Sequence, residues 1–214
     1  MEKSYSINEP NKIYILGQKN VGKTSFLRLL FGKPFDENIK PSKLGIVSTH
    51  YKNNNSGINI TIKEITDDEE FKFTNILKND LEEVLLIFII FAIDNQDSFD
   101  FAQNMVSFIQ KHLINNKSLS IILLGNKYEL LEKEPDKVKI HRNDVDIYIE
   151  NLEDIYYYQI SCKTNYNIPE VIKIINDIEV SDDEGTNQSN KENEDKKKET
   201  NEDPDQQRSS CGIF

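Results

Sequence analysis

The sequence is poor in cysteine, in positive charge and in long apolar runs. It has 214 residues and two cysteines, Cys162 and Cys211, which cannot form a disulfide framework and indicate a reducing, intracellular setting. The net charge is −11, so the chain is expected to repel nucleic acid and anionic lipid, and no nucleic-acid partner is predicted. The three histidines are scattered and lie at no zinc-binding spacing with cysteine, so no zinc site is expected.

No segment has the pattern of a signal peptide or of a membrane span. Residues 1–11 are polar and lack an apolar core. The longest apolar run, Val84–Ile93, is much shorter than the roughly 20 residues that a helix needs to cross a bilayer. Such a run is instead typical of a strand that is buried on both faces of a parallel sheet.

Apolar patterning predicts alternating strands and helices between residues 10 and 180. The expected strands are 12–16, 46–51, 58–65, 84–93, 119–124 and 155–160, with the second and third forming a hairpin. The expected helices are 23–31, 98–115, 143–151 and 168–178. The polar, acidic segment 67–83 is expected to be a loop followed by a helix. This order predicts an α/β fold, a mostly parallel six-stranded sheet with helices on both faces.

The composition changes sharply after about residue 180. Residues 181–210 contain five basic residues against ten acidic ones and almost no apolar side chain. A segment of this composition cannot bury enough apolar surface to fold, so it is expected to be disordered. The predicted organisation is therefore one globular domain, residues 1–180, followed by an acidic tail, residues 181–214.

The clearest motif is GQKNVGKT at residues 17–24, which lies between an expected strand and an expected helix. It matches G-x-x-x-x-G-K-[ST], a loop whose backbone N–H groups surround phosphate oxygens. Lys23 is expected to neutralise the β- and γ-phosphates, and the hydroxyl of Thr24 to bind Mg²⁺. The predicted phosphate-site residues are Gly17, Asn20, Val21, Gly22, Lys23, Thr24 and Ser25. By itself the loop fits ATP as well as GTP, and an ordinary glycine turn before a helix is the alternative interpretation.

A second motif, Asn126-Lys127-Tyr128-Glu129, follows an apolar strand and favours guanine. Here the chain resembles the Ras superfamily of small GTPases, whose base-reading motif is N-K-x-D. The amide of Asn126 can pair with the base edge, and the stem of Lys127 can pack over the ring. The carboxylate accepts hydrogen bonds from the guanine N–H and NH₂ groups, which adenine cannot supply. Glu129 keeps the charge of the family's aspartate on a side chain that is one methylene longer.

The resemblance covers residues 10–180 and implies further contacts. Phe35 matches the aromatic residue that stacks on guanine, and Ser161-Cys162-Lys163 matches the family's S-A-K, whose backbone contacts the base. Ser42 takes the place of the threonine that senses Mg²⁺ and the γ-phosphate. The implied Mg²⁺ site therefore consists of Thr24, Ser42 and Glu64. The segment 161–168 looks Rab-like and 91–94 looks Ras-like, so the subfamily stays open.

The segment EITDD, residues 64–68, departs from the family's D-x-x-G-Q. Asp67 replaces a glycine whose N–H meets the γ-phosphate, and its carboxylate would repel the phosphate oxygens. Asp68 replaces the glutamine that orients the attacking water. Lys19 stands where Ras proteins carry glycine. These departures predict slow GTP hydrolysis and leave the catalytic residue unassigned.

The chain ends in Cys211-Gly212-Ile213-Phe214, a C-a-a-X pattern in which the final phenylalanine favours geranylgeranyl. Gly212 is not aliphatic, which departs from the pattern. Prenylation of Cys211 is predicted, and with it attachment to the cytoplasmic face of membranes. Because a single lipid chain gives reversible attachment, exchange with the cytosol on a lipid-carrier protein is expected.

Together these motifs predict a guanine-nucleotide switch in membrane traffic or signalling, with GTP or GDP and Mg²⁺ as cofactors and with effector and exchange proteins as partners. Two other functions remain possible from the sequence. One is a GTPase-derived interaction module without turnover, which the segment 64–68 favours. The other is a P-loop ATPase or nucleotide kinase, which Asn126-Lys127 and the lack of an arginine-rich lid disfavour.

Overall fold

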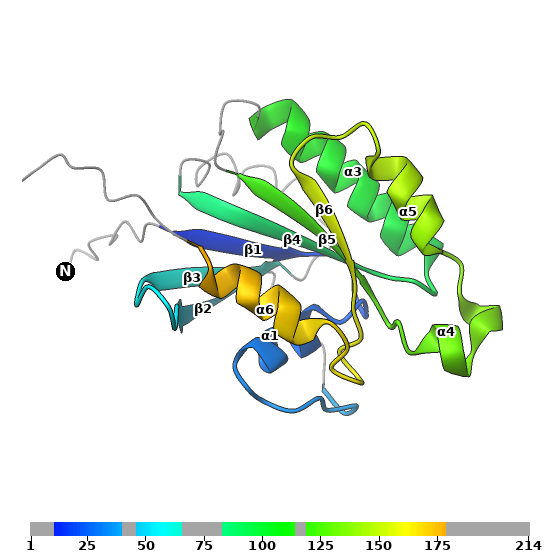
Figure 1. The fold of residues 1–214 in the computed structure, drawn as a ribbon, viewed down its shortest axis with the longest axis horizontal. Coiled ribbons are helices and arrows are strands. Elements are labelled where there is room, and N and C mark those ends of the chain that lie inside the picture. Colours follow the sequence, from blue (N-terminus) through cyan, green and yellow to red (C-terminus); the bar gives the residue numbers. More distant parts are fainter. Residues whose placement is uncertain (1–10, 40–45, 66–82, 114–118, 179–214) are drawn as a thin grey trace, which may run out of the picture. The chain divides into compact units, whose positions relative to one another are not determined.

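In a computed structural model of the chain, residues 11–39, 46–65, 83–113 and 119–178 are described. Their centre is a six-stranded sheet of order β2-β3-β1-β4-β5-β6 (Figure 1). The strands are β1 (Lys12–Leu16), β2 (Ile46–Lys52), β3 (Asn59–Ile65), β4 (Val84–Ala92), β5 (Ser120–Asn126) and β6 (Ile155–Gln159). β2 and β3 pair antiparallel, with Thr49 opposite Ile62, and the other neighbouring strands pair parallel. The predicted fold class and the predicted hairpin are confirmed.

Helices cover both faces of this sheet. The helices of the described residues are α1 (Lys23–Leu30), α3 (Gln96–Leu113), α4 (Leu130–Lys133), α5 (Arg142–Ile149) and α6 (Ile168–Asn176), with a 3-10 turn at Pro135–Lys137. Figure 1 shows α1 and α6 on one face, and α3 and α5 on the other. In the described part of the chain, no helix combines the length and the apolar character of a membrane span.

β4 explains how an uninterrupted apolar run serves this architecture. Ile87, Ile89 and Phe91 pack into the core that α3 and α5 cover. Phe88 and Ile90 pack into the core that α1 and α6 cover. All five side chains are 0% exposed, and burial of each contributes about 1.5–3 kcal/mol. The predicted strand with two buried faces is confirmed.

The parallel strands place the sequence motifs at one edge of the sheet. The loop 17–22 leaves the end of β1, the segment 126–129 leaves the end of β5, and the segment 160–163 leaves the end of β6. Neighbouring parallel strands have their carboxyl ends on the same side of the sheet, and open α/β sheets bind ligands next to these carboxyl ends. The fold therefore brings together three segments that are far apart in the sequence.

Candidate functional site

The loop 17–22 runs tightly between β1 and α1, and two of its positions require glycine. Gly17 has φ 145°, and a Cβ there would lie 2.2 Å from the carbonyl oxygen of Ile90 in β4. Gly22 has φ 102°, and a Cβ there would lie 2.1 Å from the side-chain nitrogen of Asn126. No side chain caps the start of α1, and its first turn carries no acidic residue. The N–H groups at this helix start can therefore bind an anion.

Lys23 lies beneath this loop and is 5% exposed. Its ammonium donates hydrogen bonds of 2.8 Å to the carbonyl oxygens of Gly17 and Gln18. A buried charge needs such partners, and here they curl the loop around the lysine. The ammonium is thereby placed at the cleft wall before any ligand arrives.

Thr24 and Glu64 bring two oxygen groups together at the first turn of α1. The Thr24 hydroxyl donates to Oε1 of Glu64 at 2.6 Å, and Glu64, on β3, is 1% exposed. Mg²⁺ binds oxygen ligands and commonly uses few protein groups together with water and phosphate, so this donor set fits the ion. Among the described residues, no cluster of three or more His, Cys, Asp or Glu could hold a metal. Ser42, the third predicted Mg²⁺ ligand, lies outside the described residues, as do Asp67 and Asp68.

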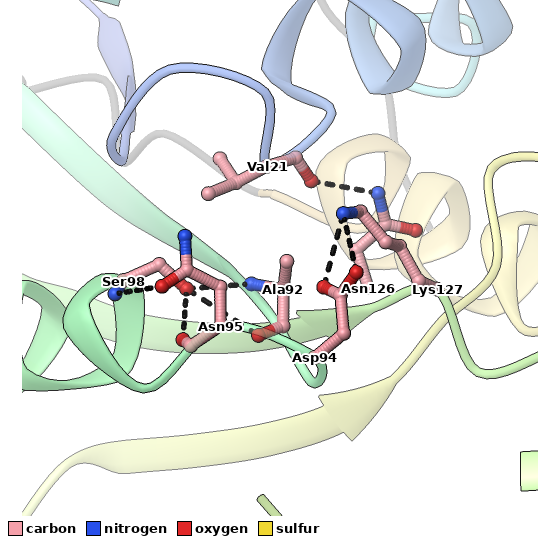
Figure 2. A network of polar contacts seen from close by, with 7 residues as sticks. All are labelled: Val21, Ala92, Asp94, Asn95, Ser98, Asn126 and Lys127. Carbon is pink, nitrogen blue, oxygen red and sulfur yellow. Dashed lines mark hydrogen bonds and ion pairs between the residues drawn. The ribbon is translucent and has the colours of Figure 1, made fainter. Parts of the chain in front are cut away.

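Asn126 connects the ends of three strands. Its side-chain nitrogen donates to the carbonyl oxygen of Val21 at 2.8 Å (Figure 2). Its side-chain oxygen accepts the backbone N–H of Cys162 at 3.0 Å. The side chain is almost fully buried, and the amide keeps a second N–H and a second lone pair with which it can meet a base. Sequence reasoning gave Asn126 a role in base recognition and missed this bridging role, which depends on residues distant in the chain.

The two other side chains of the base-reading motif are also held in place. Lys127, with φ 72°, places its ammonium 3.0 Å from each carboxylate oxygen of Asp94. Glu129 accepts a 2.5 Å hydrogen bond from the hydroxyl of Ser161, which in turn accepts the N–H of Thr164 at 3.0 Å. The Ras-like segment 91–94 contains Asp94, but sequence reasoning gave this residue no role in the site, because its contact with Lys127 joins positions 33 apart.

The segment 161–163 and the loop after α1 close the cleft on the remaining sides. Burial, together with the nearby charge of Glu129, raises the pKa of the Cys162 thiol to about 12. The thiol is therefore neutral, and its sulfur lies 3.9 Å from the carbonyl oxygen of Gly22. Lys163 forms an ion pair with Glu37, which lowers the pKa of Glu37 and raises the pKa of Lys163.

These segments enclose an open cleft of about 300 Å³. Among the residues predicted from the sequence, the following line it: Asn20, Gly22, Lys23, Thr24, Ser25, Phe35, Glu64, Asn126, Lys127, Glu129, Cys162 and Lys163. Gly17, Val21 and Ser161 lie behind the lining and support it through the contacts given above. Cys211 lies outside the described residues.

Comparison with known proteins assigns the family. Residues 12–179 match the family model described as "Ras family". The chain belongs to the Ras family. The predicted resemblance is thus confirmed, and guanine nucleotide is the ligand of this family. Family membership removes the support for a P-loop ATPase or nucleotide kinase.

Two curated proteins from Dictyostelium discoideum are similar to this Ras-family chain. It is 28% identical over 210 residues to "Ras-related protein Rab-32D", and this alignment covers 95% of the present chain and 84% of the Rab-32D chain. It is 24% identical over 164 residues to "Probable mitochondrial Rho GTPase gemA", and this alignment covers 75% of the present chain and 24% of the gemA chain.

Proposed function

We propose that this chain is a guanine-nucleotide switch of the Rab or Ras type, which hydrolyses GTP slowly and attaches to membranes through a prenyl group on Cys211. It acts in vesicle traffic or signalling. The observation that carries the proposal is the convergence of a phosphate loop and a base-reading carboxylate, Glu129, on one cleft. The similarity to a Ras-related Rab protein supports the assignment to membrane traffic.

Guanine selectivity comes from Glu129. One of its oxygens is already held by the Ser161 hydroxyl, so the carboxylate is oriented before the base binds. Guanine presents an N–H and an NH₂ group to such a carboxylate, whereas adenine presents a ring nitrogen without a proton at the matching position. An adenine base would leave the other oxygen of this carboxylate without a donor, and an acceptor that is shielded from water without a donor costs about 1–3 kcal/mol.

The opposite end of the cleft has the charge and the donors for phosphate. Lys23 supplies a buried ammonium, and the start of α1 supplies N–H groups without a side-chain cap. Bound Mg²⁺ would neutralise phosphate charge, with the hydroxyl of Thr24 and the carboxylate of Glu64 as its protein oxygens. Ser42, by its position in the sequence, would join them and couple the γ-phosphate to its own segment of the chain.

GTP would act through the segments of the sequence that contain Ser42, Asp67 and Asp68, and the GTP-bound form would present a surface for effector proteins. Asp68 in place of glutamine, and Asp67 in place of glycine, are the reason to expect slow hydrolysis. The same residues favour a second candidate, an interaction module that holds GTP without turnover. The two candidates differ in one quantity, the single-turnover rate of GTP hydrolysis.

The decisive experiment is to purify the protein, denature it and identify the nucleotide that is released. GDP or GTP at about one molecule per chain is the expected result, and Lys23→Ala, purified in parallel, should release none. The proposal would be contradicted if the purified protein contained no nucleotide and also failed to bind GDP that is added together with a chelator. Single-turnover hydrolysis by GTP-loaded protein then separates the slow switch from the inactive module.

A further inference from the structure

An ion pair joins the base-reading segment to Asp94, a residue outside that segment. The ammonium of Lys127 is 3.0 Å from both carboxylate oxygens of Asp94 (Figure 2). Lys127 follows β5 and Asp94 follows β4, and these strands pair up to Ala92 and Asn126. The side chains are 31% and 25% exposed, so water screens the pair less than it screens a surface salt bridge.

The turn that carries Asp94 is fixed by a buried hydroxyl. Ser98 is 0% exposed, and its Oγ accepts the N–H of Ala92 at 3.0 Å and donates to the carbonyl oxygen of Asn95 at 2.7 Å (Figure 2). The N–H of Ile93 also donates to the carbonyl oxygen of Asn126 at 3.1 Å. These hydrogen bonds connect the turn to the base-reading segment and hold the Asp94 carboxylate in place beside that segment.

In the base-reading segment, Lys127 is the side chain whose orientation most depends on a partner of this kind. Lysine has a flexible stem with about 2 kcal/mol of rotamer entropy, whereas Asn126 is held at both ends of its amide. Pairing with Asp94 selects one orientation of the stem. It also offsets the ammonium charge, so Lys127 serves mainly through the packing of its stem and leaves the phosphate charge to Lys23.

We infer that Asp94 is a positioning residue for the nucleotide: it holds Lys127 so that the lysine stem covers the base, and it thereby slows nucleotide release. This inference rests on the proposed function. Asp94 is not among the residues that line the cleft, so it acts through Lys127. The ligand class is a guanine nucleoside phosphate, and the regulated quantity is its dissociation rate.

The test is a double-mutant cycle on the dissociation of a fluorescent GDP analogue. Asp94→Asn removes the charge and keeps the shape, and Lys127→Met removes the ammonium and keeps most of the stem. We expect Asp94→Asn to release GDP about fivefold faster, on the order of 1 kcal/mol. In the Lys127→Met background, the same change should have no further effect. Asp100→Asn is the matched control, because Asp100 lies on α3 and accepts a hydrogen bond from Gln96 at 2.8 Å; its rate should equal that of the wild type.

Two further readouts separate positioning from simple stabilisation. In nucleotide-free protein, acetylation of Lys127 by an amine reagent, followed by mass spectrometry, should be several-fold faster in Asp94→Asn, while the thermal midpoint stays within about 2 °C of the wild type. An unchanged GDP dissociation rate in Asp94→Asn, or a fivefold effect that persists in Lys127→Met, would overturn the inference alone. A different result would overturn the proposed function and, with it, the nucleotide role of Asp94. In that result, Asp94 protects Lys127 from acetylation, but the wild-type protein binds no guanine nucleotide.

Discussion

Replacing Gly22 with alanine should displace the Asn126 side chain and so disrupt the cleft. A Cβ at this position would lie 2.1 Å from the side-chain nitrogen of Asn126, and the backbone φ is 102°. The Asn126 amide has little freedom to move, because it donates to Val21 at 2.8 Å and accepts from Cys162 at 3.0 Å. The new methyl group must therefore displace the Asn126 amide, which breaks both hydrogen bonds and separates the phosphate loop from the base-reading segment.

The expected cost follows from these contacts. An alanine in the left-handed region costs about 1 kcal/mol, and each of the two hydrogen bonds contributes about 1 kcal/mol. Gly22→Ala should therefore lower the free energy of unfolding by about 3 kcal/mol. For a domain of this size, that corresponds to a fall in the thermal midpoint of roughly 6–12 °C. Binding of GDP should be lost as well, because Asn126 leaves its place.

The assay is thermal unfolding of nucleotide-free protein, followed by circular dichroism, together with a fluorescent-GDP titration. Gly57→Ala is the control for backbone strain alone, since Gly57 has φ 73° and its Cβ would meet nothing within 4 Å. In an Asn126→Ala background, Gly22→Ala should cost only the strain, about 1 kcal/mol. The reasoning is wrong if Gly22→Ala costs no more than Gly57→Ala, or if its cost is unchanged when Asn126 is alanine.

Four other predictions concern single side chains. Lys23→Ala should abolish binding of a fluorescent GTP analogue, because it removes the buried ammonium of the phosphate loop; unchanged affinity would contradict the phosphate site. Ser161→Ala should weaken GDP binding about tenfold, because Glu129 loses the hydroxyl that orients it. It should also narrow the preference for GDP over inosine diphosphate, which lacks the NH₂ group; an unchanged preference would argue against that role. In a Cys211→Ser variant, Cys162 should resist thiol reagents at pH 8 in native protein and react in denaturant. The thiolate is the reactive form, and burial raises the pKa of Cys162 to about 12; rapid labelling of native protein would count against this burial. Cys211→Ser should leave the protein cytosolic in cell fractionation, and an unmodified intact mass of the wild type would disprove the anchor.

Local patterns explain most of what the sequence predicted correctly. The apolar run of β4 and the isoleucine and valine spacing of α6 depend on near neighbours in the chain, so they can be read from it. Several helix ends differ from the prediction by one or two residues. α5 begins at Arg142, one residue before the prediction, where the Asp144 carboxylate accepts the backbone N–H of His141 at 2.8 Å. α3 begins at Gln96, two residues early, where Asn95 accepts the N–H of Ser98 at 3.3 Å. α4 was missed, because its four residues are too few to show a helical period.

The residues of the candidate phosphate loop and base-reading motif can be recognised along the chain, because each motif needs fixed residue types at fixed spacing in a single segment. The contacts that hold these side chains in place become visible only in the folded chain. The pairs Asp94 with Lys127 and Ser161 with Glu129 join residues that are 33 and 32 positions apart, and the bond from Asn126 to Val21 spans 105. Such contacts arise where parallel strands end side by side, and no pattern along the chain records which strands will be neighbours.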